Sequence, residues 1–83
     1  MATKSKVQYE ARPDDEIAWD IRQAMKFDSD VPDERIRVEV HNGLTKLEGT
    51  VDRSFQKEAA EVDANRVKGV RGVTNRIQVL PLI

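Results

Sequence analysis

Hydrophobic and polar residues alternate in two short segments that are separated by an Asn-Gly pair. Such alternation is typical of strands that bury one face. Asn42-Gly43 predicts a tight two-residue hairpin, because both turn positions require positive φ. The predicted inward positions are Ile36, Val38 and Val40 in the first strand, and Thr45, Leu47, Gly49 and Val51 in the second.

Two further segments carry apolar residues at helical spacing. The first follows Pro13 and should run from Asp14, as N-cap, to about Phe27. Its predicted apolar face comprises Ile17, Ala18, Ile21, Ala24 and Met25. The second should begin at a Ser54 cap and run to about Lys68, with Gly69 as its left-handed stop.

A third alternating segment completes the pattern and ends at Pro81. Its inward positions are Val73, Asn75, Ile77 and Val79. The order is therefore α-β-β-α-β, and the crossover makes the third strand parallel to the second. We predict an α+β fold with two helices on one face of a three-stranded mixed sheet, formed by residues 14–83, and a flexible arm or linker over residues 1–13. The strand residues predicted to be buried under both helices are Ile36, Val38, Val40, Leu47, Val51, Ile77 and Val79.

Two inward residues of the predicted strands are not hydrophobic. Gly49 lacks a side chain, so either a helix approaches closely there or the strand bulges. Asn75 brings an amide into an apolar strand, and a buried amide needs partners. We expect Asn75 to tie its strand to the Gly69–Gly72 loop.

Composition limits the classes of function. The chain has 83 residues, no cysteine and a net charge of −1, so it forms one small domain without disulfides or thiolate metal sites. Near-neutral charge argues against nucleic acid as the main partner. The basic start, Met1–Lys6, is not followed by the apolar segment of a signal peptide. The compartment, periplasm or cytoplasm, therefore stays open.

Several short motifs together resemble the BON domain, a small bacterial module linked to osmotic stress, nodulation and transport. They are Ile36-x-Val38, Asn42-Gly43, Leu47-Glu48-Gly49-Thr50-Val51, Glu58-Ala59-Ala60-Glu61 and Gly69-Val70-x-Gly72-Val73-x-Asn75. The resemblance covers residues 14–79 and looks like one repeat of a multi-BON protein. It implies a non-enzymatic module that attaches to phospholipid or to other proteins. Asp63, where the family usually has alanine, and the large Trp19 depart from its pattern.

Trp19 is the most distinctive candidate binding residue. At about 100° per residue it points away from Ile17, Ile21 and Met25, toward the side that holds Arg22, Gln23 and Lys26. An exposed Trp among cations suits a membrane interface or a protein hot spot. The alternative is that Trp19 packs on the N-terminal arm, or on the stems of Arg22 and Gln23.

Two other features have both a functional and a structural interpretation. Lys68, Gly69, Arg71 and Gly72 could bind an anionic headgroup, or could form an ordinary solvated loop. The stripe of Phe55, Ala59 and Val62 could meet the first helix or a partner.

Charge is distributed unevenly along the chain. Residues 14–34 hold eight acids and two bases, whereas residues 52–79 hold six bases and four acids. Copies could therefore associate weakly head to tail, unless the charges neutralise one another within the domain. Asp28-Ser29-Asp30 lacks the glycine of a calcium loop, and His41 has no catalytic partner in any motif. We predict no catalytic residues, no metal site and no cofactor.

The functional hypothesis is a non-catalytic binding module. One version attaches to phospholipid headgroups through Trp19, Arg22, Lys26 and the 68–72 loop. The other packs against neighbouring repeats, subunits or other protein domains. Membrane attachment requires Trp19 and the cations to lie on one plane. Assembly requires edges of the domain that carry opposite charges.

Overall fold

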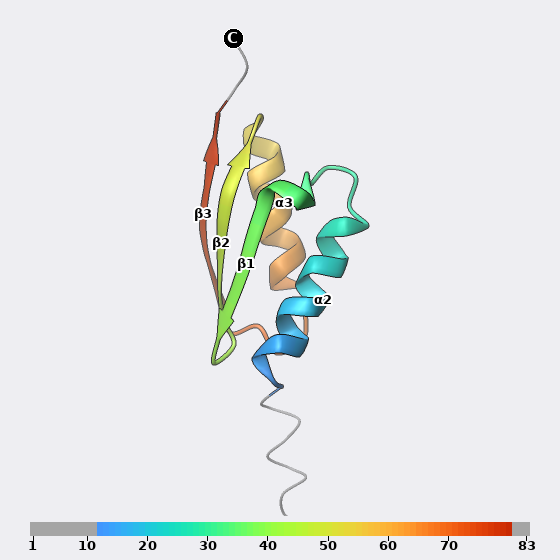
Figure 1. Ribbon diagram of the computed structural model, residues 1–83, viewed down its shortest axis with the longest axis vertical. Helices are drawn as coiled ribbons and strands as arrows, with labels where there is room; N and C mark the ends of the chain where they lie inside the picture. Colours follow the sequence, from blue (N-terminus) through green and yellow to red (C-terminus); the bar gives the residue numbers. More distant parts are fainter. Residues whose placement is uncertain (1–11, 81–83) are drawn as a thin grey trace, which may run out of the picture.

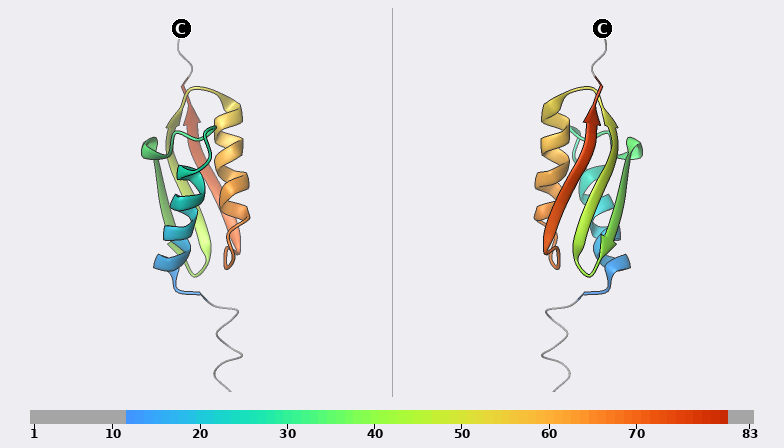
Figure 2. Two further views of the ribbon diagram at one scale, coloured as in Figure 1. Left: turned by 90° about the vertical axis from the view of Figure 1, so that its right-hand side faces the viewer. Right: turned by 90° about the vertical axis from the view of Figure 1, so that its left-hand side faces the viewer.

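The predicted α+β architecture is confirmed by the computed structural model, which describes residues 12–80. The elements are helix α2 (Asp14–Lys26), the 3-10 turn η1 (Asp33–Arg35), strands β1 (Ile36–His41) and β2 (Leu44–Val51), helix α3 (Ser54–Asn65) and strand β3 (Gly72–Val79). The sheet order is β1-β2-β3, with β1 antiparallel and β3 parallel to β2. Both helices cover one face of the sheet and leave the other open (Figures 1 and 2). Pro81 and residues 1–11 of the predicted arm lie outside the described residues.

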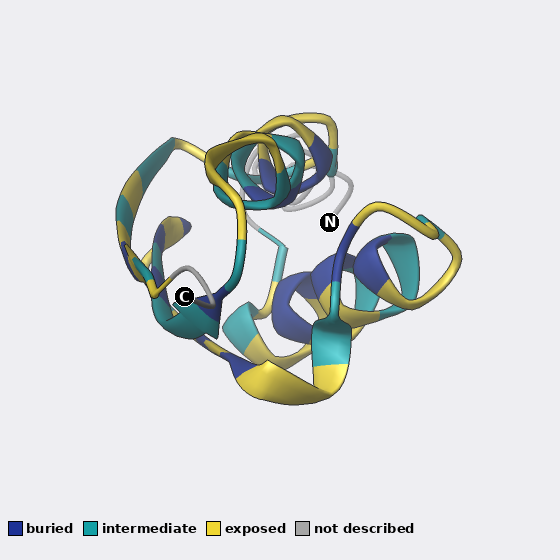
Figure 3. Cartoon of the chain, turned by 90° about the horizontal axis from the view of Figure 1, so that it is seen from above, coloured by how far each residue is buried: buried dark blue, intermediate teal, exposed yellow. Residues whose placement is uncertain are grey.

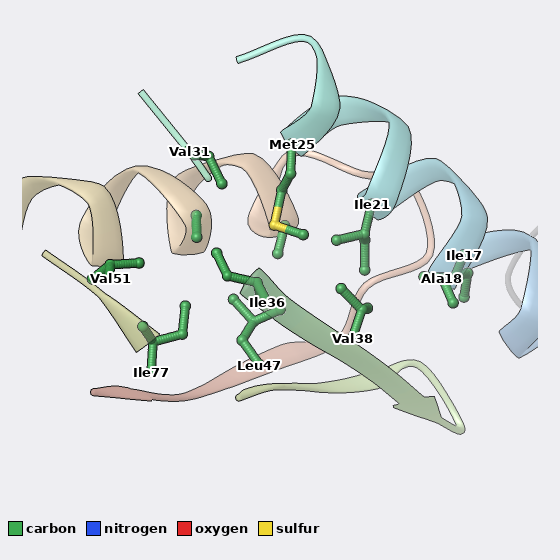
Figure 4. Close-up of a cluster of buried hydrophobic side chains, with 12 residues drawn as sticks. Ile17, Ala18, Ile21, Met25, Val31, Ile36, Val38, Leu47, Val51 and Ile77 are labelled. Carbon is green, nitrogen blue, oxygen red and sulfur yellow. The ribbon is translucent and has the colours of Figure 1, made fainter. Parts of the chain in front are cut away.

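The core lies between the helices and the covered face of the sheet (Figure 4). Its largest fully buried side chains come from α2, β2 and β3. Ala60 and Ala64 are also fully buried, and their small size lets α3 lie close to the strands. Each large buried side chain contributes about 1.5–3 kcal/mol relative to exposure. The six largest are Ile17, Ile21, Met25, Leu47, Val51 and Ile77.

Most predicted core positions are confirmed, with two exceptions and one addition. Ile36 and Val38 are buried, but Val40 and Val79 are only half-buried because each lies near the end of an edge strand. The sequence pattern missed Val31, which is 5% exposed and packs into the core from the connection between α2 and β1.

The Asn42-Gly43 hairpin is confirmed, and it also anchors α2. Asn42 and Gly43 have φ of 54° and 80°. Asp14 was wrongly predicted as the N-cap: that position is Pro13, and Asp14 is the first helical residue. Its carboxylate instead accepts hydrogen bonds from the backbone N–H groups of Asn42 (2.8 Å) and Gly43 (3.0 Å). These bonds stabilise the ionised form and lower the pKa of Asp14.

The ends of α3 differ from the prediction. Ser54 begins the helix but does not cap it; the side-chain oxygen of Gln56 accepts the N–H groups of Asp52 and Arg53, both at 2.9 Å. The helix ends at Asn65, three residues before Lys68, because the Val67 N–H bonds to the Ala64 oxygen in a tighter turn. Gly69 has the expected left-handed φ of 99°, but it lies in the connection to β3.

Gly49 was predicted either to lie against a closely packed helix or to mark a strand bulge. The prediction of a close helix is wrong. A Cβ built there would lie 2.1 Å from the carbonyl oxygen of Arg35 and 3.0 Å from the Ile36 Cα. The close neighbour is thus the backbone at the start of β1, with which Gly49 pairs. The φ of Gly49, +141°, is also a conformation that side chains disfavour.

Asn75 ties β3 to α3, so the predicted link to the Gly69–Gly72 loop is wrong. Its Nδ2 donates to the Lys57 carbonyl oxygen (2.9 Å) and to Glu61 Oε1 (3.2 Å). Its Oδ1 accepts the N–H of Ile77 at 3.1 Å. The half-buried amide is therefore satisfied on both sides and fixes the helix against the edge strand.

We predict that Gly49→Ala lowers the free energy of unfolding by about 2–4 kcal/mol, because the new Cβ overlaps the Arg35 carbonyl and strains φ. Urea unfolding measures this change. Gly72→Ala is the matched control: its Cβ would meet only a Leu44 methyl group at 3.5 Å. Equal stability of the two variants would contradict the close backbone approach.

We also predict that Asp14→Asn lowers the melting temperature at pH 7 more than Asp15→Asn does. Asp15 lies in the same helical turn, is exposed, and thus controls for the lost charge. Because the pKa of Asp14 is lower in the folded protein, its contribution is complete above the unfolded value of 3.8 and is lost as pH falls further. The difference between the variants should therefore shrink below about pH 4. A difference that is constant from pH 7 to pH 3 would refute the hairpin contact.

Candidate functional site

The helix layer turns an apolar surface toward solvent. Ile17, Ile21 and Met25 face the sheet, which leaves Trp19 on the opposite side of α2 with 57% of its surface exposed. The prediction that Trp19 points away from the core is confirmed. Figure 3 shows the same division along both helices, with buried positions toward the sheet and exposed positions on the outside.

Phe27 extends this surface at the C-terminal end of α2. It is 83% exposed and forms the C-cap of the helix. At about 100° per residue, Trp19 and Phe27 lie on either side of the direction pointing away from Ile17, Ile21 and Met25, Trp19 about 20° and Phe27 about 60° from it. The sequence analysis missed Phe27 as a surface residue, because Phe27 served only to mark the end of the predicted helix and was not assigned to either face of it.

Helix α3 adds two more exposed apolar side chains, Phe55 (53%) and Val62 (46%). The interpretation that the Phe55, Ala59 and Val62 stripe packs on the first helix is wrong for these two; only Ala59 packs against the core. Helices α2 and α3 contact each other, so their outward sides form one continuous layer. We call Trp19, Phe27, Phe55 and Val62 the outer apolar surface.

Charges of both signs surround this surface. Arg22 and Lys26 are exposed on α2 beside Trp19, as the sequence predicted. Glu16 is bound by Arg12 (3.0 Å), which also pairs with Asp20 (2.7 Å). Arg12 thus offsets part of the acidity of the first helical turns. The two helices together hold seven acids and three bases, so the helix layer is acidic overall.

The 68–72 loop lies at the hairpin end of the domain (Figure 1). It borders the first turns of α2: Arg12 Nη1 donates to the Lys68 carbonyl oxygen (2.7 Å), and Ile17 packs beneath Gly69. The Arg71 N–H donates to the Gly43 oxygen (2.8 Å), so this group already serves the fold. The side chains of Lys68 and Arg71 remain exposed. The loop therefore borders α2 on the Ile17 side, whereas Trp19 is on the opposite side of the helix.

Two carboxyl groups meet where the α2–β1 connection crosses α3. Asp63 is only 9% exposed, and its Oδ2 is buried without an N–H or O–H donor among the described residues. Burial and a hydrogen-bond contact with the Asp28 carboxyl group raise the pKa of Asp63 to about 7. The same contact lowers the pKa of Asp28, which also accepts the Asp30 N–H at 3.0 Å. Sequence reasoning noticed Asp63 only as a departure from alanine.

Among residues 12–80 no group of three His, Cys, Asp or Glu side chains could hold a metal ion. Neither helix described there is long and apolar enough to cross a bilayer. His41 is exposed at the end of β1.

Two comparisons with known proteins identify the family of this chain. A family model described as "BON domain" matches residues 13–81. Osmotically-inducible protein Y of Escherichia coli (strain K12) is 36% identical over 59 residues, which are 71% of this chain and 29% of that protein. The chain thus spans less than a third of the length of this bacterial relative. The family match covers most of the chain, so the protein belongs to the BON domain family.

Proposed function

We propose that this BON domain is a non-catalytic module that attaches to phospholipid membranes through the outer apolar surface. The observation that carries the proposal is the exposure of four large apolar side chains on one side of the helix layer: Trp19, Phe27, Phe55 and Val62. Single exposed apolar residues are common on proteins, but a group on adjacent helices is typical of an interaction surface.

The energetics favour reversible attachment. Complete burial of a large apolar side chain contributes about 1.5–3 kcal/mol, and these four are already partly covered. Their combined insertion therefore amounts to several kcal/mol, similar to a weak lipid anchor and far below a membrane span. A Trp ring also suits the headgroup boundary, where its apolar body and its N–H group are both accommodated.

Cations add a smaller contribution. Arg22 and Lys26 flank Trp19 and can extend their charged ends toward headgroups while their stems stay on the apolar surface. Lys68 and Arg71, with the Gly69 and Gly72 backbone, would join them if the domain tilts toward its hairpin end. Each basic residue near an anionic surface contributes about 1 kcal/mol. Because acids outnumber bases on the two helices, we expect only a modest preference for anionic lipid.

A protein partner, including a neighbouring repeat or a second copy, is the alternative occupant of the same surface. The relative Osmotically-inducible protein Y is more than three times as long as the matched segment. Such a partner would bind the apolar side chains without needing lipid. Sedimentation of the free domain tests self-association at low and high salt, since contacts between opposite charges weaken as salt rises.

We predict that the domain co-sediments with vesicles of phosphatidylglycerol and phosphatidylethanolamine. Binding should shift the emission of Trp19, the single tryptophan of the chain, to shorter wavelength. Phe55→Ser should reduce the partition coefficient about tenfold, because it removes one inserting side chain of about 1.4 kcal/mol or more. Phosphatidylcholine vesicles should bind more weakly than the anionic mixture.

Leu44→Ser is the matched control for this experiment. Leu44 is 56% exposed and belongs to β2, on the sheet face that the helices leave open. The proposal predicts vesicle binding equal to that of the parent for this variant. Equal losses for Leu44→Ser and Phe55→Ser, or no emission shift at saturating anionic lipid, would contradict attachment through the helix layer.

A further inference from the structure

The Asp28–Asp63 contact joins two parts of the domain that are far apart in sequence. Asp28 lies in the connection from α2 to β1, directly after Phe27, and Asp63 lies in α3, directly after Val62. Each acid is therefore adjacent to one residue of the outer apolar surface.

Two ionised carboxylates cannot hydrogen-bond to each other, so this contact requires one shared proton. Asp63 is the member that holds it, because it is buried while Asp28 has the Asp30 N–H to stabilise its charge. The other charged groups that act on Asp63 are Asp30, which favours protonation, and Arg66, which opposes it. Arg66 is exposed and only partly offsets the two acids.

At its η1 end the connection is held by Arg35, which pairs with Asp52 (3.4 Å) and donates to Thr50 Oγ1 (3.2 Å). Val31 anchors it in the core, and its backbone is held by the bonds from Asp28 N–H to Met25 oxygen (3.1 Å) and from Val31 N–H to Asp28 oxygen (3.0 Å). These backbone bonds are local to the turn. Within residues 12–80 no N–H group joins residues 28–31 to α3 by a hydrogen bond, so the Asp28 and Asp63 carboxyl groups make the polar contact between them.

We propose that Asp28 and Asp63 form a proton-operated latch that fixes the α2–β1 connection to α3 and thereby regulates the outer apolar surface. Loss of the shared proton leaves two adjacent negative charges, one of them buried, and their repulsion displaces the connection together with Phe27. The latch rests on the proposed function only for its effect on membranes. Attachment is tighter below neutral pH, where the surface is fixed and carries one negative charge fewer.

The latch itself can be tested without lipid, by carbon-detected NMR titration of the side-chain carboxyl groups. The Asp63 carbon should titrate with a midpoint near the pKa of about 7, and its midpoint should fall in Asp28→Asn, whose amide can donate to an ionised Asp63. Amide protection of residues 28–31 should decrease between pH 6 and pH 8 in the parent and stay constant in Asp63→Asn. Comparing protection factors removes the intrinsic pH dependence of exchange.

A titration midpoint for Asp63 below pH 5 would overturn the latch. So would unchanged protection of residues 28–31 across a titration near neutral pH. If Asp63→Asn does not fold, the parent titration and the Asp28→Asn variant still decide the question.

The effect on membranes is measured with the same anionic vesicles at pH 6 and pH 8. The parent should bind roughly fivefold more tightly at pH 6, the effect expected for one charge near an anionic surface. Asp63→Asn should lose this dependence, whereas Glu34→Gln, which removes an exposed acid from η1, should keep it. A pH dependence that persists in Asp63→Asn would contradict regulation by the latch. No binding of the parent at either pH would refute the proposed function and its regulation, while the titration would still establish or overturn the latch.

Discussion

The structure depends on packing two helices against one face of a three-stranded sheet. Ile17, Ile21 and Met25 of α2 meet Leu47, Val51 and Ile77 of the sheet, and all six are essentially excluded from water. A chain of 83 residues has material for a single layer of this kind. The outer side of the helices and the open face of the sheet therefore both remain in solvent. What each of these surfaces displays decides what the domain can bind.

The contacts that secure this layer at its margins are polar. Asp14 fastens the start of α2 to the hairpin, Asn75 fastens α3 to β3, and Arg12 connects α2 to the loop before β3. Each lies where the hydrophobic core ends. The Asp28–Asp63 contact occupies the remaining junction, between the end of α2 and α3, and differs from the others because it needs a proton. In the proposed latch, this is the junction that responds to pH near neutrality.

Local patterns in the sequence predicted the elements well. Alternation identified all three strands, the Asn42-Gly43 pair identified the hairpin, and helical phase placed Trp19 outside the core. The predictions that were wrong for Asp14 and Gly49 concern contacts between residues that are far apart in the sequence. Asp14 has the chemistry of a cap, and no local signal shows that the hairpin will reach its carboxylate. Gly49 signals a close approach, but only the β1–β2 register shows that the neighbour is the Arg35 backbone.

The same limit applied to the candidate surface. Trp19, Arg22 and Lys26 lie on one helix and could be grouped by phase. Joining Trp19 to Phe55 and Val62 required knowing how α2 lies against α3, and Phe27 was hidden by its position at a helix end. The burial of Asp63 could not be predicted from the sequence either, since a charged residue in an amphipathic helix is normally assigned to the solvent-exposed side.

The central claim is that the outer side of the helix layer enters the lipid surface. Quenching of Trp19 fluorescence by vesicles that carry nitroxide-labelled acyl chains tests it most directly, because a quencher must approach the indole ring closely. With labels at a shallow and a deep chain position, the account predicts strong quenching by the shallow label and weak quenching by the deep one, as expected for a ring at the headgroup boundary. Vesicle-bound protein whose Trp19 is quenched by neither label would show that a different surface makes the contact.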